Sequence, residues 1–277
     1  MGLDESSTLR DAGPSYERAG TGEPLLLIHG LGSDRHVWDL VMPQLTDTFD
    51  VIRVDLPGHG RSPRLALGAD ASPAGLAQQV AALLDSIDLP TTHVAGSSLG
   101  GWIGLELARL GRARSVTALA PAGFWRNGIV PLIAHTNRWL ARAVDPIAPA
   151  LLKVTPLRAV GFWTSSANPS ALEPHLAAQA TRAQARSSGW AAALAATHPR
   201  RCDARDVAES IPVTIVWGDR DRILPAASCQ APEGAPAHAR WVRLHDCGHV
   251  PMWDAPADAV RLIEETVTSR QRIDRLA

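Results

Sequence analysis

Short apolar runs alternate along this chain with longer stretches in which apolar residues recur every three or four positions. Runs such as Leu25 to Ile28 and Val213 to Trp217 are apolar on both faces, as parallel strands covered by helices on two sides are. The pattern therefore predicts an α/β fold built on a doubly wound, mostly parallel sheet. The predicted strands are residues 25–28, 51–56, 92–96, 115–120, 212–217 and 240–244.

One long stretch interrupts the alternation. Between Pro121 and about Arg205 no convincing strand is found, and the pattern is helical with six proline interruptions between residues 131 and 174. We therefore predict a core formed by residues 1–121 and 206–277, with a helical insertion at residues 122–205.

Length and composition fit a globular α/β protein. The chain has 277 residues, of which 45% are hydrophobic and 20% charged, and its formal net charge is −1. A chain of this length buries a sizeable core, and a net charge near zero argues against general nucleic-acid binding.

No signal-peptide pattern and no apolar run of transmembrane length is found in the sequence. We expect a cytoplasmic protein that binds a small-molecule substrate and neither nucleic acid nor a membrane; its oligomeric state is not predicted.

Charge is divided unevenly between the two parts. The insertion carries ten basic and three acidic residues, a net of +7, whereas the remainder carries 17 basic and 25 acidic residues, a net of −8. Three interpretations stay open: steering of an anionic substrate into a cleft, docking of an acidic carrier, or arginines on solvated helices. On the first interpretation Arg126, near the start of the insertion, is the candidate anchor for a substrate carboxylate.

The sequence Gly96-Ser97-Ser98-Leu99-Gly100 carries the strongest chemical signal. A buried strand is predicted before it, and apolar residues at helical spacing follow it from Leu99 to Leu110. This context places Ser98 on a strand-to-helix turn, the position of the nucleophile in a Gly-x-Ser-x-Gly elbow. The helix that begins beside Ser98 directs its positive end toward an oxyanion formed there.

A serine hydroxyl is a weak nucleophile, so Ser98 needs a general base and an acid that orients the base. His249 follows the predicted strand at residues 240–244, and the stretch from Ala108 to Val144 contains no acid. The strand at residues 212–217 ends in a loop that carries Asp219 and Asp221. The chain thus offers the order serine, acid, histidine.

Four motifs in this order resemble those of the α/β-hydrolase superfamily, and they extend over nearly the whole chain. They are His29-Gly30-Leu31-Gly32, Asp55-Leu56-Pro57-Gly58-His59-Gly60-Arg61-Ser62, the elbow at residues 96–100, and the segment from Trp217 through Gly218 and Asp221 to Pro225.

The resemblance implies a role for several residues. Asp221 takes the place of the triad acid, and Asp219 is the competing choice. The backbone N–H groups of Leu31 and Leu99 form the oxyanion hole, while His29 holds the loop that carries Leu31. The insertion corresponds to a helical lid over Ser98 that shapes the substrate pocket.

Further residues are candidates for substrate binding because of their position. Aromatic side chains near the elbow or in the insertion offer apolar surface to an acyl group, and no metal or cofactor is expected. Cys202, Cys229 and Cys247 have no metal-ligand spacing, and Cys247 is expected to be buried near the loop of His249. The candidate pocket residues are Trp102, Phe124, Trp125, Arg126, Trp139 and Val250.

These observations predict a serine hydrolase that cleaves a carboxylic ester or lactone through an acyl-enzyme. A carbon-carbon bond hydrolase acting on a diketone is the alternative, although Ser97 and Val250 stand where relatives of that kind often carry asparagine and an aromatic residue. A non-catalytic ligand-binding protein on the same fold is the third possibility. Epoxide hydrolases and dehalogenases of this fold attack with aspartate, so Ser98 argues against both.

Overall fold

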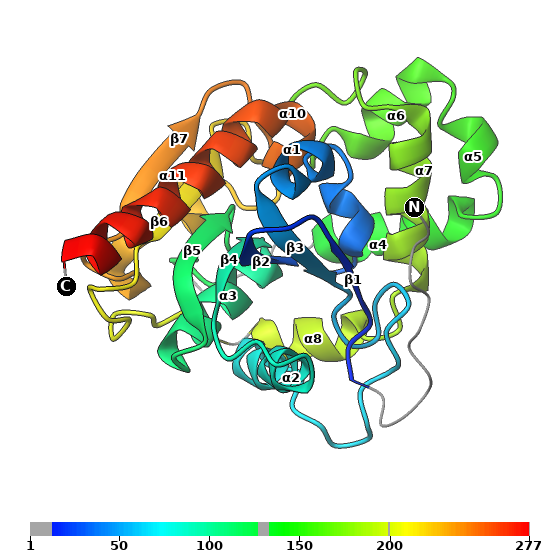
Figure 1. The fold of residues 1–277 in the computed structure, drawn as a ribbon. Coiled ribbons are helices and arrows are strands. Elements are labelled where there is room, and N and C mark those ends of the chain that lie inside the picture. The colour runs from blue at the N-terminus through cyan, green and yellow to red at the C-terminus, as the bar shows by residue number, and fades with distance from the viewer. Residues whose placement is uncertain (1–12, 127–132, 199, 277) are drawn as a thin grey trace.

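A seven-stranded sheet lies at the centre of the computed structural model, which describes residues 13–126, 133–198 and 200–276 (Figure 1). The strand order is β1-β3-β2-β4-β5-β6-β7, and every neighbouring pair is parallel except β1 with β3. The six predicted strands and the α/β fold class are confirmed. The strands are β1 (Tyr16–Ala19), β2 (Glu23–Ile28), β3 (Phe49–Val54), β4 (Thr92–Ser97), β5 (Ala113–Leu119), β6 (Val213–Gly218) and β7 (Arg240–Leu244).

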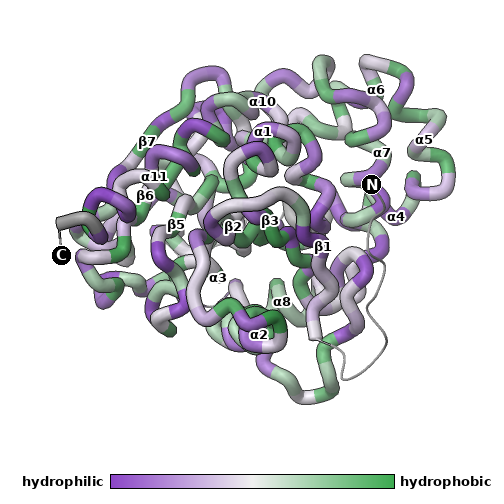
Figure 2. The backbone as a smooth tube through the Cα atoms, in the orientation of Figure 1, coloured by the Kyte–Doolittle hydropathy of each residue, from purple (hydrophilic) through white to green (hydrophobic). Residues whose placement is uncertain are grey.

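Alternate side chains of the central strands enter two separate cores. In β2, Leu26 and Ile28 pack on one side of the sheet and Leu25 and Leu27 on the other, and all four are fully buried. This alternation follows from the two-residue period of a strand and explains why both faces are apolar. Figure 2 shows β2 and β3 as strongly hydrophobic chain at the centre of the molecule.

Helices cover both faces of the sheet. The core that contains Leu26 is closed by α2 (Pro73–Ser86) and α3 (Leu99–Arg109). The opposite core is closed by the 3-10 helix η1 (Arg35–Trp38), α1 (Met42–Thr46), α10 (Pro251–Asp254) and α11 (Pro256–Leu276). Two short elements, α9 (Ala226–Cys229) and η2 (Pro232–Gly234), follow β6.

The predicted insertion forms helices between β5 and β6, and over its described residues it contributes no strand to the sheet. A small core of its own includes Leu152, Phe162 and Leu176. Figure 1 shows α4 to α7 grouped beside the sheet and α8 close to α2. The helices are α4 (Ile133–Val144), α5 (Ala148–Leu151), α6 (Thr155–Phe162), α7 (Pro174–Arg186) and α8 (Trp190–Thr197).

The edge strand β1 was not predicted because it has no apolar run. It pairs antiparallel with β3, and two ion pairs join the strands: Glu17 pairs with Arg53 at 2.6 Å, and Arg18 pairs with Asp50 at 2.5 Å. Its sequence, Tyr-Glu-Arg-Ala, is half-buried or exposed at every position. Charged side chains on an edge strand also discourage pairing with another chain.

Parallel pairing brings the carboxyl ends of β2, β4, β6 and β7 to one edge of the sheet. In open α/β sheets this edge is where ligands bind. The loops that leave these four strands carry the residues of the predicted site.

The loop after β3 depends on a buried ion pair, from which a stability prediction follows. Asp55 accepts hydrogen bonds from the amide N–H groups of Arg35 and Arg61 at 2.8 and 2.9 Å, and its Oδ2 lies 2.7 Å from Nη2 of Arg35. Replacement of Asp55 by Ala leaves the buried Arg35 without its buried carboxylate and with only the half-exposed Glu17 at 3.3 Å, so we expect the free energy of unfolding to fall by about 3 to 5 kcal/mol. Equilibrium urea unfolding measures the change.

The matched control is Asp47→Ala, because Asp47 is exposed at the end of α1. This variant should stay within about 0.5 kcal/mol of the wild type. Equal losses in the two variants would contradict the account of Asp55.

Candidate active site

Ser98 lies on a strained turn between β4 and α3. Its backbone has φ 54° and ψ −116°, and its N–H donates to the carbonyl of Leu119 at 2.8 Å. A non-glycine residue held at positive φ costs on the order of 1 to 3 kcal/mol and persists only where the surrounding structure enforces it. The turn therefore presents Ser98 in a conformation that a relaxed chain rarely adopts.

The two glycines of the elbow are needed for close approach of the backbone. A Cβ atom on Gly96 would lie 2.1 Å from the carbonyl oxygen of Gly100, and a Cβ on Gly100 would lie 2.2 Å from that of Ile28. Side chains at these positions would force the strand, the turn and α3 apart. The motif spacing is thus explained by packing of the backbone around Ser98.

Asp221 and His249 come together from the loops that follow β6 and β7. The Nδ1–H of His249 donates to Oδ2 of Asp221 at 2.8 Å, and both side chains are buried. The other carboxylate oxygen, Oδ1, accepts from the amide N–H groups of Ile223 and Leu224 at 2.9 and 2.8 Å. The carboxylate is held from both sides, and it fixes the imidazole in the tautomer whose Nε2 is free to accept a proton.

Two opposing effects act on the pKa of Asp221. Burial favours the neutral acid and would raise this pKa, but the charge of His249 and the hydrogen bonds from His249, Leu224 and Ile223 outweigh burial and lower it below its ordinary value. Asp221 is therefore ionised at neutral pH.

Asp219, the competing choice for the acid, faces away from this pair. Its Oδ2 lies 2.8 Å from Nδ1 of His245, and its Oδ1 accepts from the N–H of Cys247. Cys247 is fully buried, and burial raises the pKa of its thiol.

The loop after β2 lies against the elbow. A Cβ atom on Gly30 would lie 3.0 Å from the Cβ of Ser98, so only a glycine allows this approach without a shift of its neighbour. The buried His29 holds the loop, because its Nδ1–H donates to the carbonyl of Gly30 at 2.7 Å and its Nε2 accepts from the N–H of Leu56 at 2.9 Å. Burial lowers the pKa of His29 and favours this neutral form.

Leu31 and Leu99 both line the cavity beside Ser98. Leu99 is the first residue of α3, where an N–H has no carbonyl partner within the helix. Leu31 lies in a turn, and its N–H donates to no backbone carbonyl within the described ranges. Both amides are thus available as hydrogen-bond donors.

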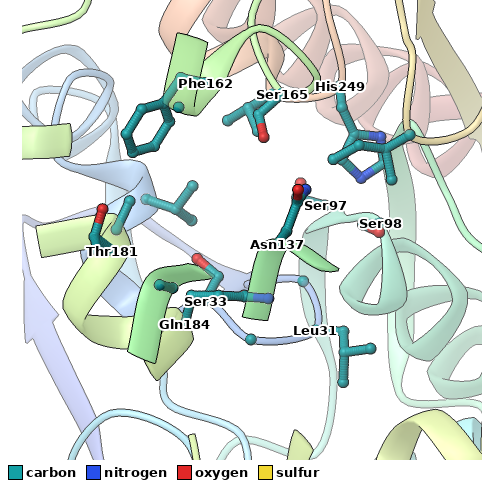
Figure 3. Close-up of a pocket in the computed structure, with 18 of the residues that line it drawn as sticks. Leu31, Ser33, Ser97, Ser98, Asn137, Phe162, Ser165, Thr181, Gln184 and His249 are labelled. Carbon is teal, nitrogen blue, oxygen red and sulfur yellow. The ribbon is translucent and has the colours of Figure 1, made fainter. Parts of the chain in front are cut away.

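A cavity of about 440 Å³ lies between this edge of the sheet and the insertion. Ser98 and His249 both line it, and Figure 3 shows them at the same end. The described structure has no hydrogen bond between Ser98 and His249. Such bonds are often long in a ligand-free enzyme and tighten when substrate is in place.

The cavity wall is mostly apolar. Its charged or chargeable lining, over the described residues, is confined to His249. Hydroxyl and amide side chains such as Thr181, Gln184 and Asn137 supply local polar contacts (Figure 3). The aliphatic residues of the wall come largely from the insertion: Leu140, Val144, Leu151, Leu152, Leu157, Val160 and Leu194.

Of the six residues predicted to bind substrate, Trp125 and Val250 line the cavity. Trp102 and Phe124 are not among the described lining residues, and both side chains are buried in the core. Trp102 packs edge-on against Trp125 at 5.8 Å, and its Nε1–H donates to Glu106 at 3.0 Å. Phe124 packs against two tryptophans, Trp217 and Trp241.

The other two candidates, Trp139 and Arg126, are surface residues in the structure. Trp139 is 73% exposed and lies outside the cavity wall. Arg126 is exposed, and its Nη1 lies 3.7 Å from Oε1 of Glu233.

Two arginines of the insertion act as internal cross-links. The buried Arg138 donates to the carbonyls of Gln184 and Ser187 at 2.5 and 2.7 Å. The buried Arg158 donates to the carbonyl of Leu152 at 2.6 Å. Part of the positive charge of the insertion therefore satisfies backbone carbonyls within it.

Sequence reasoning missed most of the cavity wall. Asn137, Ala141 and Val144 recur at helical spacing on α4, which is a signal for a helix with one distinct face. The same spacing does not say whether that face meets a cavity or a core. The sequence therefore indicated a distinct face on α4 but did not show that this face lines a binding cavity.

Within the described ranges, no three His, Cys, Asp or Glu side chains are gathered as metal ligands would be. None of the helices in the described parts combines the length and apolarity that crossing a bilayer requires.

Comparison with known proteins agrees with the α/β fold. The model of the alpha/beta hydrolase family matches residues 25–262. The chain belongs to the alpha/beta hydrolase family, and a hydrolase activity is supported.

Two relatives illustrate the range of the family. The chain is 31% identical over 278 residues to a pimeloyl-[acyl-carrier protein] methyl ester esterase of Methylococcus capsulatus, covering 91% of this chain and 98% of the relative. It is 32% identical over 248 residues to the dihydrolipoyllysine-residue acetyltransferase component of an acetoin cleaving system of Pseudomonas putida. That match covers 87% of this chain but 62% of the relative.

Solved structures show the same fold. A thermophilic esterase from Thermogutta terrifontis superimposes with a TM-score of 0.69 and 24% sequence identity over 93% of both chains. At this identity the likeness concerns the fold alone.

The pairing of Asp221 with His249 predicts how the carboxyl group titrates. In the wild type we expect Asp221 to titrate below 3.8, and in His249→Phe we expect its pKa to rise, because burial then acts without the opposing charge. Ionised Asp221 therefore stabilises the folded protein above pH 3.8, and this contribution is lost as the pH falls toward the lower folded-state pKa. Carbon-13 NMR of aspartate-labelled protein measures both titrations; an unchanged pKa in the variant would contradict the pairing.

Proposed function

We propose that this protein is a serine hydrolase that cleaves an uncharged carboxylic ester or lactone through an acyl-enzyme. The observation that carries the proposal is the buried hydrogen bond between Asp221 and His249. His249 lines the same cavity as Ser98, which lies on a strained elbow. An orienting acid, a base and a nucleophile on three loops of one sheet edge are the components that acyl transfer requires.

The proposed chemistry begins with His249. Asp221 holds Nδ1–H, so Nε2 accepts the proton of Ser98 while Oγ attacks the substrate carbonyl. The negative charge that develops on the carbonyl oxygen is stabilised by the N–H groups of Leu31 and Leu99, which need no reorganisation. The tetrahedral intermediate collapses, His249 gives its proton to the departing alkoxide, and the acyl group remains on Ser98.

Water completes the cycle. His249 takes a proton from the attacking water, the second tetrahedral intermediate forms at the same oxyanion hole, and its collapse releases the carboxylic acid and restores Ser98. In a lactone the alcohol is part of the same molecule, so the product is a hydroxy acid.

The cavity wall favours a neutral, largely apolar acyl group. Burial of an ionised carboxylate without a partner is strongly unfavourable, and the described wall contains no arginine or lysine. The ester chemistry named for the Methylococcus relative is consistent with the proposed bond type. We therefore propose an uncharged ester of small to medium size.

Replacement of Ser98 by Ala should abolish both covalent labelling by a fluorophosphonate and turnover of an aryl ester, because no oxygen nucleophile remains at the elbow. Ser269→Ala is the matched control, since this hydroxyl lies on α11 and donates to the carbonyl of Glu265. Gel fluorescence and a chromogenic assay report the two activities. Wild-type turnover in Ser98→Ala would refute the proposed nucleophile.

Substrate charge gives a second prediction. p-Nitrophenyl butyrate should be hydrolysed with a kcat/KM at least about 100-fold higher than p-nitrophenyl hemisuccinate, a difference of about 2.7 kcal/mol in transition-state binding. The two esters share the leaving group and differ chiefly in the terminal carboxylate. A preference for the charged ester would contradict the neutral-substrate proposal.

A further inference from the structure

The loop that carries His249 is enclosed by the turn between α6 and α7. We call residues 162–168 the docking turn. The N–H of Val250 donates to the carbonyl of Ser165 at 3.1 Å. A Cβ atom on Gly248 would lie 2.8 Å from that carbonyl oxygen, so the two segments touch at backbone level. The insertion thus contacts the histidine loop on both sides of His249.

Asp254 joins these two segments through its carboxylate. Oδ1 accepts from the hydroxyl of Ser166 at 2.5 Å, and Oδ2 accepts from the N–H of Ala167 at 2.9 Å. The same Oδ2 accepts from the N–H of Gly248 at 2.7 Å. One side chain on α10 therefore holds both the docking turn and the residue before His249.

Asp254 has no cationic partner among the ion pairs of the described residues. Its three partners are neutral donors, and hydrogen bonds to a charged acceptor are stronger and shorter than those between neutral groups. The arrangement fixes the direction of each donor, which a surface ion pair does not.

The acid loop meets the same turn. Arg222, the residue after Asp221, donates to the carbonyl of Trp163 at 2.7 Å, and its guanidinium lies 5.3 Å from the ring centre of Trp163. Both loops that hold the candidate acid and base are therefore in contact with the docking turn.

The docking turn also forms part of the cavity wall. Phe162 and Ser165 line the cavity, as does Trp253, the residue before Asp254. Phe162 and Trp253 pack edge-on with ring centres 5.9 Å apart. A substrate in this part of the cavity therefore contacts both the docking turn and α10.

Resting on the proposed function, we propose that Asp254 is a positioning residue that couples occupancy of the cavity to the placement of His249. An acyl group packed against Phe162 and Trp253 holds the docking turn in one position. Through its hydrogen bonds to that turn and to Gly248, Asp254 then holds the loop of His249 in place. Binding energy from a non-reacting part of the substrate is thereby used to orient the reacting groups, which raises kcat more than it lowers KM.

The test is a series of p-nitrophenyl esters from acetate to hexanoate. In the wild type kcat should rise with acyl length. In Asp254→Ala we expect kcat for the hexanoate to fall at least about tenfold, with a loss under about threefold for the acetate and little change in KM. Equal losses for both esters, or no loss, would overturn the proposal.

Conservative variants separate positioning from a general structural role. Asp254→Asn retains an oxygen for the N–H groups of Gly248 and Ala167 and a donor for Ser166, so it should restore most of the dependence of kcat on acyl length. Ser166→Ala removes one of the two hydrogen bonds from the docking turn to Asp254 and leaves that of Ala167, so it should weaken the dependence on acyl length even if Asp254→Ala does not fold. Asp258→Ala is the control, because Asp258 is half-buried on α11 and pairs with Arg261, away from the docking turn.

Fluorophosphonate labelling distinguishes failure of the proposed hydrolase function from failure of the role proposed for Asp254. A wild type that is not labelled at Ser98 overturns the proposed function and the role of Asp254 with it. A labelled wild type, with the same acyl-length dependence in Asp254→Ala and Ser166→Ala, overturns the role of Asp254 and leaves the hydrolase intact.

Discussion

The hydrogen bond from Nδ1–H of His249 to Oδ2 of Asp221 is the interaction on which the candidate site depends. It joins the loops after β6 and β7, and neither side chain is more than 7% exposed. A buried imidazole and carboxylate are stable here because each satisfies the other and because the amides of Ile223 and Leu224 occupy the second oxygen. Without this pair, the base proposed for Ser98 would have no fixed tautomer.

The parallel sheet supplies the rest of the geometry. Its strands are buried on both faces, so their register is strongly determined, and the loops at their carboxyl ends are placed with little freedom. The elbow is held more tightly still by contacts between backbone atoms at Gly96, Gly100 and Gly30. The insertion then closes the site from the other side and provides most of its apolar wall.

Much of this arrangement was predictable from the sequence because it follows from local patterns. Two-sided apolar runs indicated the central strands, and the elbow and the loop carrying Asp221 were recognisable from motif spacing. The edge strand β1 was not, since Tyr16 to Ala19 contain no apolar run, and the antiparallel pairing with β3 joins segments that only the fold brings together.

The substrate-binding residues were harder to predict. Trp102 and Trp125 have the same chemistry and pack against each other, yet only Trp125 reaches the cavity. Which side of a packed pair faces open space is decided by tertiary structure, and no sequence period encodes it. Arg126 shows the same limit, because its partner Glu233 is distant in the sequence. The hydrogen bonds of Asp254 likewise join segments that only the fold brings together.

The measurement that tests the central claim most directly is rapid acid quench of the protein with an excess of an aryl ester, followed by mass spectrometry of its peptides. The account predicts a burst of released phenol, with an acyl group attached to the peptide that contains Ser98. Turnover without a burst and without an adduct, or an acyl group on a different residue, would contradict it.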